Sequence, residues 1–133
     1  MNKDELLKMA VKARNNAYAP YSYFKVGAAI LAKNGKVYSG CNIENSSYGA
    51  SICAERVALF KAVSEGEKEF LAIAVATDTK KPVMPCGICR QVLSEFAPNL
   101  KIYAINIDGK VKKALLDQIL PDAFTKEDLE NIK

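Results

Sequence analysis

Two short segments of the chain carry side chains of the types and spacing that a metal-dependent reaction centre needs. They are Cys53-Ala54-Glu55 and Pro85-Cys86-Gly87-Ile88-Cys89, which together supply three thiols and one carboxylate. Three thiolates can hold a zinc ion at three tetrahedral positions and leave the fourth open for water or substrate. The sequence contains no histidine. Sulfur and oxygen must therefore supply every ligand, and any general base must be something other than imidazole.

Two charged residues follow the first of these cysteines. Glu55 stands two positions after Cys53, so we expect it to lie near the metal without binding it and to accept a proton from bound water. Three thiolates overcompensate a zinc dication, and the guanidinium of Arg56 beside the sulfurs would offset the excess negative charge. The alternatives are an ordinary acid in the first turn of a helix and an ordinary solvated arginine.

Two other roles for the cysteines need to be weighed. The pair Cys86-x-x-Cys89 alone is typical of a thioredoxin-like redox site, but that interpretation leaves Cys53 and Glu55 without a role. A closed structural zinc site would take Cys41 as its fourth ligand. Such sites usually consist of two C-x-x-C pairs, and this chain has one. We therefore favour three ligands and an open position, with Cys41 as a packed thiol.

Helices predicted from hydrophobic spacing would position these residues. Both metal-binding segments fall at helix starts, where free backbone N–H groups stabilise a thiolate. The sequence predicts helices over about 3–17 with Asn2 as N-cap, about 53–65 with Ser51 as cap, about 86–97, and 126–132 with Thr125 as cap.

The remaining apolar runs predict strands. They lie at 26–32, 36–42, 71–76, 101–107 and 110–114, and Asn34-Gly35 and Asp108-Gly109 are the two hairpin signals. Helices and strands alternate along the chain in a pattern that favours an α/β fold, with one mixed sheet and helices on both faces. A length of 133 residues suits a single domain, 1–133.

The composition excludes several other classes of protein. The net charge is +4, but the lysines are dispersed, and the densest clusters, Lys80-Lys81 and Lys110 to Lys113, are interpreted as a solvated turn and a solvated strand end. A nucleic-acid groove needs a longer basic stripe interleaved with aromatics. The apolar run 70–76 is too short for a membrane span, and the charged N-terminus lacks a signal-peptide core. We expect a cytoplasmic protein without nucleic-acid or membrane partners.

The two metal-binding segments resemble the signature of zinc-dependent nucleobase deaminases, in a form with cysteine in place of histidine. The rest of the chain resembles the small, homotetrameric class of cytidine deaminases, and the matching segments cover nearly the whole sequence in order. These segments are Tyr18-Ala19-Pro20-Tyr21-Ser22-Tyr23-Phe24-Lys25-Val26-Gly27-Ala28-Ala29, Gly40-Cys41-Asn42-Ile43-Glu44-Asn45-Ser46-Ser47-Tyr48-Gly49, Cys53-Ala54-Glu55-Arg56, Pro85-Cys86-Gly87-Ile88-Cys89-Arg90-Gln91 and Leu120-Pro121-Asp122-Ala123-Phe124.

The resemblance implies a fold and a metal site. The fold would be a three-layer α/β/α sandwich with a mixed five-stranded sheet. Cys53, Cys86 and Cys89 would bind one zinc ion per subunit, Glu55 would shuttle protons, and a second shell of hydrogen bonds to the thiolates would come from Arg56 and Gln91.

The resemblance also implies a nucleoside site. Asn42 and Glu44 would hold the ribose hydroxyls, since alternate residues of an extended segment share one face. Phe24 would stack near the pyrimidine, and Ala54 would contact the substrate. Tyr48 and Phe124 resemble positions that complete the pocket of a neighbouring subunit in a homotetramer.

The implied reaction is hydrolytic deamination of cytidine and deoxycytidine to uridine and deoxyuridine with release of ammonia, a step of pyrimidine salvage that uses zinc-bound hydroxide. Two alternatives stay open. One is a zinc deaminase of another substrate, such as a nucleotide, a base in a nucleic acid or an aminonucleoside antibiotic. Glu44 would repel a phosphate, which weighs against a nucleotide. The other is a non-enzymatic four-cysteine zinc module, which requires Cys41 as a ligand.

Overall fold

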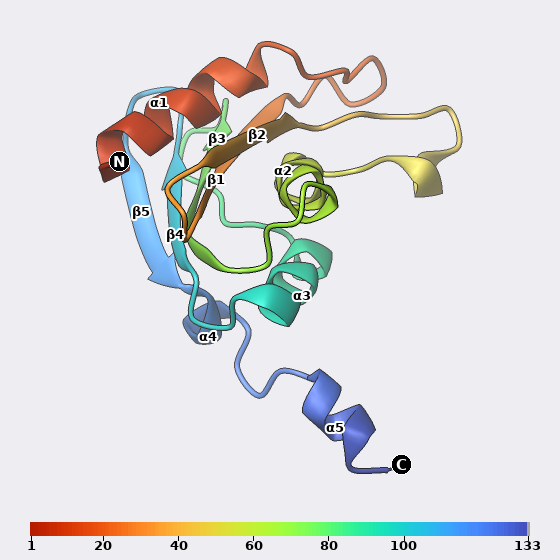
Figure 1. Ribbon diagram of the computed structural model, residues 1–133. Coiled ribbons are helices and arrows are strands. Elements are labelled where there is room, and N and C mark those ends of the chain that lie inside the picture. Colours follow the sequence, from red (N-terminus) through yellow and green to blue (C-terminus); the bar gives the residue numbers. More distant parts are fainter. Residues whose placement is uncertain (133) are drawn as a thin grey trace.

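A single mixed sheet organises the protein, which is described over residues 1–132 by a computed structural model. Its strands lie in the order β2-β1-β3-β4-β5 (Figure 1). Neighbouring strands are antiparallel except for β3 and β4, which are parallel. The strand bounds are β1 Val26–Ala32, β2 Val37–Cys41, β3 Phe70–Thr77, β4 Lys101–Ile105 and β5 Val111–Leu115. The predicted mixed five-stranded sheet is confirmed.

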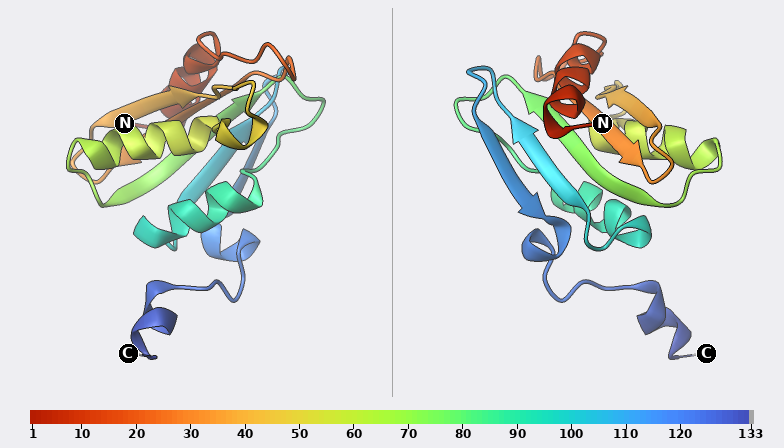
Figure 2. Two further views of the ribbon diagram at one scale, coloured as in Figure 1. Left: turned by 90° about the vertical axis from the view of Figure 1, so that its right-hand side faces the viewer. Right: turned by 60° about the vertical axis from the view of Figure 1, so that its left-hand side comes forward.

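Helices cover both faces of the sheet, which confirms the predicted three layers (Figure 2). Helix α1 (Lys3–Arg14) packs Leu6 and Ala10 against one face. Helices α2 (Ala54–Ser64) and α3 (Gly87–Phe96) pack against the other face. Because β1 and β3 are buried on both faces, their sequences are apolar, apart from Thr77 at the end of β3, rather than alternating.

Helix α1 begins where predicted and ends earlier. The side-chain oxygen of Asn2 accepts a hydrogen bond from the Glu5 backbone N–H at 2.9 Å, as an N-cap does. The predicted end at residue 17 is wrong, because residues 15–17 form tight turns after Arg14. Tyr18 then leaves the helix direction to pair with Ile43.

The two helices that carry the cysteines begin at the cysteines themselves. Cys53 is the N-cap of α2 and Cys86 is the N-cap of α3. The predicted cap Ser51 is wrong, because its hydroxyl lies outside the helix and accepts a hydrogen bond from the Asn45 N–H at 3.1 Å.

The C-terminal part adds two short helices. Helix α4 (Leu116–Ile119), which the sequence did not predict clearly, follows β5 directly, and α5 (Lys126–Glu130) lies away from the sheet (Figure 1). Thr125 is the N-cap of α5 as predicted, and its backbone N–H donates to Asp128 at 2.9 Å. Within residues 1–132, no helix is both long enough and apolar enough to cross a bilayer.

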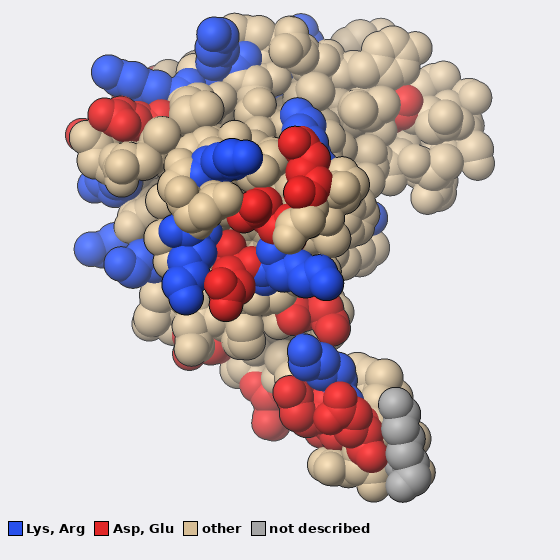
Figure 3. Space-filling model, viewed as in Figure 1, with Lys and Arg blue, Asp and Glu red and all other residues tan. Residues whose placement is uncertain are grey.

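Charged side chains are unevenly distributed over the surface. In the view of Figure 3, lysine, arginine and acidic side chains intermix over the sheet and helices, whereas the lobe at the upper right is almost free of charge. This lobe is made by segments 15–25 and 42–50 (Figure 1). It carries exposed aromatic side chains, namely Tyr18, Tyr21, Tyr23, Phe24 and Tyr48.

Candidate active site and metal centre

Three cysteine sulfurs from two helix starts form one cluster. The Sγ atoms of Cys53, Cys86 and Cys89 lie within 4.8 Å of one another, and those of Cys53 and Cys86 are 3.8 Å apart. Zinc–sulfur bonds of about 2.3 Å at tetrahedral angles place sulfurs about 3.8 Å apart, so the donor set and its spacing fit zinc. Cys41 lies in β2 and does not belong to this cluster, as expected for a packed thiol.

The thiols of Cys53 and Cys89 differ in how readily they lose a proton. A hydrogen bond from the Cys89 thiol, with further help from Arg56 and Cys86, lowers the pKa of Cys53 to about 5. The same hydrogen bond to Cys53 raises the pKa of the buried Cys89 well above its ordinary range. The Cys53 thiol is therefore ionised at neutral pH, and a metal must displace the proton of Cys89 to bind its sulfur.

The guanidinium of Arg56 lies beside the cluster, as the charge argument anticipated. Its Nη2 donates to the Cys53 sulfur at 3.4 Å, and this hydrogen bond raises the pKa of Arg56. The buried Nε of Arg56 has no hydrogen-bond partner among the described residues. The positive charge of Arg56 thus lies beside the sulfur cluster, and its Nε–H is still available to donate a hydrogen bond.

Glu55 is a buried carboxyl group in the first turn of α2. Only 5% of the residue is exposed, and burial, together with the negative charge on Cys53, raises the pKa of Glu55 to about 7. An ordinary first-turn acid on a helix surface would be solvated, so this alternative does not hold here. A carboxyl group near neutrality exchanges protons readily in either direction.

One cavity joins the metal cluster to the predicted nucleoside residues. Its volume is about 410 Å³, within the range of small-molecule sites. It is lined by two sulfurs of the cluster, by Glu55 and by most of the predicted substrate residues, namely Cys53, Cys86, Glu55, Ala54, Phe24, Asn42 and Glu44. Val75 and Thr77 at the carboxyl end of β3 also line it.

Asn42 and Glu44 line this cavity from an extended segment. Backbone hydrogen bonds to Tyr18 on one side and Ile52 on the other hold residues 42–44 in place. The Asn42 amide is partly used within the chain, because it accepts from the Val26 N–H at 2.9 Å and donates to the Phe24 carbonyl at 2.7 Å. One amide hydrogen and one lone pair remain for a ligand.

Ser22 is a site residue that sequence reasoning missed. Its hydroxyl donates to Glu44 and accepts from the Phe24 N–H at 3.0 Å, so it joins two predicted substrate residues. The backbone N–H groups of Tyr21 and Ser22 also donate to Glu44, each at 3.0 Å. The Ser22 bonds are the main cause of the lowered pKa of Glu44. The signal available in the sequence was Ser22 itself, a turn-forming hydroxyl residue two positions before Phe24.

Three predicted site residues lie elsewhere in this chain. Tyr48 is 76% exposed and Phe124 is 59% exposed, and neither lines the cavity. The side-chain amide of Gln91 donates to the Phe124 carbonyl at 2.8 Å rather than to a sulfur.

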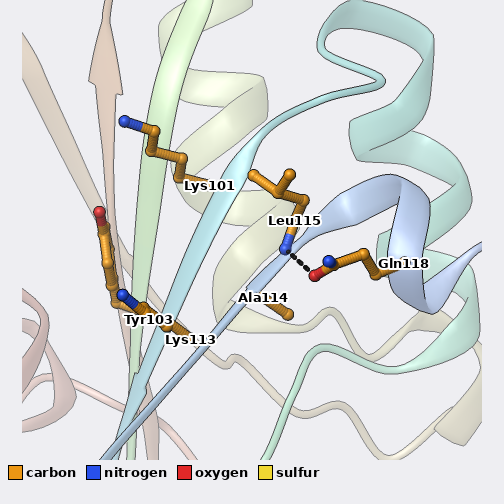
Figure 4. A pocket seen from close by; sticks show the side chains of 6 residues that line it. All are labelled: Lys101, Tyr103, Lys113, Ala114, Leu115 and Gln118. Carbon is orange, nitrogen blue, oxygen red and sulfur yellow. Dashed lines mark hydrogen bonds between the residues drawn. The ribbon is translucent and has the colours of Figure 1, made fainter.

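A second hollow of about 480 Å³ is somewhat larger but has different chemistry. It lies where β4 and β5 meet α4, and Figure 4 shows the residues that line it, namely Lys101, Tyr103, Lys113, Ala114, Leu115 and Gln118. The side-chain oxygen of Gln118 accepts from the Leu115 N–H at 2.9 Å. This hollow has neither a thiol nor a carboxylate, so we place the reaction at the cysteine cluster.

Comparisons with known proteins point to the same chemistry. Residues 1–105 match the family described as the cytidine and deoxycytidylate deaminase zinc-binding region. A cytidine deaminase of Halalkalibacterium halodurans is 52% identical over 132 residues, which are 98% of this chain and 100% of that protein. The crystal structure of a cytidine deaminase from Burkholderia pseudomallei superimposes with a TM-score of 0.91 at 50% identity, covering 93% and 100% of the two chains. A more distant relative, blasticidin-S deaminase of Bacillus cereus, is 31% identical over 92% of this chain and 91% of its own length.

Proposed function

The chain belongs to the cytidine and deoxycytidylate deaminase family, and on that premise we propose that its cavity catalyses the hydrolytic deamination of cytidine and deoxycytidine. The enzyme is zinc-dependent, and we assign the metal to Cys53, Cys86 and Cys89. The observation that carries this assignment is the cavity itself, which joins the sulfur cluster, a buried carboxyl group and a polar segment suited to a sugar.

Proton transfer is the task of Glu55. Zinc held by the three thiolates would supply a Lewis acid that lowers the pKa of water at the open position. Glu55 takes the proton of that water and delivers it to N3 of the pyrimidine, which makes C4 more electrophilic. The remaining hydroxide adds at C4 as the double bond between C4 and N3 opens. Glu55 then moves the proton of the added hydroxyl to the 4-amino group, which leaves as ammonia while the C4 carbonyl forms. One carboxyl group within reach of three atoms in turn suffices, and no histidine is needed.

Nucleoside binding is the task of the opposite end of the cavity. The free amide hydrogen and lone pair of Asn42 suit one ribose hydroxyl, which both donates and accepts. Glu44 has one lone pair beyond those that Ser22 and Tyr21 use, and its negative charge favours a neutral nucleoside over a nucleotide. Phe24 supplies an aromatic face, and 42% of the residue is exposed.

We further propose a homotetramer whose subunits complete one another's cavities. The aromatic lobe in Figure 3, which is almost free of charge, is suited to burial against another chain. Within it the rings of Tyr21 and Tyr48 meet edge to face, with centroids 5.8 Å apart, at the rim next to Glu44. Phe124, exposed and outside its own cavity, is the residue we assign to a neighbour's cavity.

Two coarser features complete the proposal. Residues 1–133 form one catalytic domain, which the single continuous sheet supports. The protein acts in the cytoplasm, and support comes from the four free cysteines, because three thiols must stay reduced to bind metal.

The decisive experiment combines metal analysis with a substrate panel. We expect one zinc per subunit and a loss of ultraviolet absorbance with cytidine and deoxycytidine but not with CMP or adenosine. Blasticidin S belongs in the panel, because one relative at 31% identity is a blasticidin-S deaminase. Turnover of the antibiotic without turnover of cytidine would replace the proposed substrate and leave the metal assignment intact.

A further inference from the structure

Arg90 holds two separate parts of the chain with one side chain. Its Nε donates to the Pro85 carbonyl at 2.7 Å and its Nη1 donates to the Ile119 carbonyl at 2.8 Å. We propose that Arg90 is a positioning residue that fixes the Cys86 segment and segment 119–124 to each other. Retention of the metal and placement of the C-terminal segment then depend on one guanidinium. The inference rests on the proposed function for the identity of the metal.

Both carbonyls need a partner that the local backbone does not supply. Pro85 is buried, and the chain turns into α3 immediately after it. Ile119 is the last residue of α4, so its carbonyl has no partner in the next helical turn. Arg90 itself stands in the first turns of α3, where a cation is unfavourable next to the positive end of the helix. The position is therefore explained by the two acceptors.

The bond to Pro85 acts on a metal ligand. Pro85 directly precedes Cys86, so a fixed Pro85 carbonyl sets the orientation of the peptide from which the Cys86 side chain departs. Substitution of groups that orient metal ligands in this indirect way commonly costs about 10- to 100-fold in metal affinity or activity. Arg90 also lines the cavity, so it lies next to the site that it would organise.

The bond to Ile119 acts on the segment that bears Phe124. Arg90 holds the start of this segment, and the neighbouring Gln91 holds its end through the Phe124 carbonyl at 2.8 Å. The first turns of α3 thus carry a metal ligand, Cys89, and both tethers of the segment 119–124. Disturbing Arg90 should loosen the metal site and this segment together.

Arg90→Lys is the most informative substitution. It keeps the positive charge but loses the planar fork that reaches two carbonyls at once. With the zinc-loaded enzyme, we expect release of zinc to a chelator to be about 10- to 100-fold faster. We also expect faster tryptic cleavage after the exposed Lys126. Ser94→Ala is the matched control, because it removes a side-chain bond within α3, to the Gln91 carbonyl, and should match the parent in both measurements.

Gln91→Leu separates the effect on zinc release from the effect on tryptic cleavage, and it can be measured even if Arg90→Lys fails to fold. It should accelerate cleavage after Lys126 and leave zinc release within about twofold of the parent. Parent-like zinc release by folded Arg90→Lys would overturn the proposal, as would unchanged cleavage in both variants. A parent enzyme that retains zinc without deaminating cytidine would instead contradict the proposed function alone.

Discussion

The two ends of the cavity are built in opposite ways. At the metal end, Cys89 and Glu55 are almost completely buried and lie on helices packed against the central sheet. At the sugar end, loop residues line the cavity, and Phe24 among them is 42% exposed. The proposed reactive groups therefore all come from one chain, whereas the groups that we assign to nucleoside binding are held by hydrogen bonds between loops.

Backbone conformation shows the same contrast. At the metal end, both ligand helices begin in ordinary extended N-cap geometry at Cys53 and Cys86. At the sugar end, Tyr23 adopts a positive φ of 59° directly before Phe24, a conformation that non-glycine residues rarely adopt. Such local strain persists only where surrounding contacts enforce it, here the bonds around Ser22 and Glu44. Substitutions at the metal end should therefore abolish chemistry or folding, and those at the sugar end should alter binding.

The largest effect is expected at the buried carboxyl group. Glu55→Gln keeps the shape and burial of the side chain but cannot accept or deliver a proton, so kcat should fall by about 10²- to 10⁴-fold or more. Zinc content and KM should stay near the parent values. The check is steady-state kinetics with metal analysis on the same sample. Deamination at a rate near that of the parent would show that another group moves the protons.

Loss of a metal ligand should abolish both activity and zinc binding. Cys53→Ser removes the sulfur at the centre of the hydrogen bonds with Arg56 and Cys86. Cys41→Ser is the matched control, because Cys41 lies outside the cluster, and it should retain zinc. Loss of zinc in Cys41→Ser would instead support the alternative of a four-cysteine zinc module with Cys41 as a ligand.

Zinc binding to the metal-free protein should release protons and tighten as pH rises. The Cys89 pKa is raised by its bond to Cys53, and the thiol must lose its proton to bind metal. Titration with zinc in buffers of different ionisation enthalpy would measure the protons released. Affinity that is independent of pH between 6 and 8 would contradict the assignment of Cys89 as a ligand.

A packing substitution tests how the metal end is supported. Gly40 in β2 lies so close to α2 that an added Cβ would stand 2.6 Å from the Ala58 nitrogen and 2.8 Å from the Ala54 carbonyl oxygen. Gly40→Ala should therefore lower the free energy of unfolding by about 1–3 kcal/mol. Gly49→Ala, where nothing lies within 4 Å of the added Cβ, should stay within about 0.5 kcal/mol. Denaturant unfolding would measure the free energy of unfolding of both variants. Equal losses in the two variants would contradict the close approach of β2 to α2 at Gly40.

The smallest effect is expected at the sugar end. Ser22→Ala removes the hydroxyl that joins Glu44 to the Phe24 N–H, and a net loss of about 1 kcal/mol corresponds to roughly a fivefold rise in KM for cytidine. The value of kcat should change little, because Glu55 and the sulfurs are untouched. Ser64→Ala, whose hydroxyl bonds within α2, serves as the control. A fall in kcat with unchanged KM would show that the two ends are coupled.

Sequence reasoning was accurate where local chemistry and packing agree. The apolar runs gave the strands, and the cysteine spacing located two helix starts that the sheet brings together. It failed where a distant partner decides the outcome. Ser51 is a good cap residue by type, yet its hydroxyl bonds Asn45. Gln91 stands two positions after Cys89, yet its side-chain amide donates to the carbonyl of Phe124, 33 positions away.

The lysines at β5 lie where their charge would oppose aggregation through the edge of the sheet. Within residues 1–132 this strand pairs with β4 alone, so its outer edge offers backbone groups that could pair with a strand from another molecule. Lys112 and Lys113 lie on this strand and Lys110 directly precedes it, and all three residues are exposed. Repulsion between lysines on two approaching molecules opposes such edge-to-edge growth into fibrils. These lysines, which contribute to the net charge of +4, would thus help to keep the protein in solution. Replacing them with threonine would favour self-association through this edge.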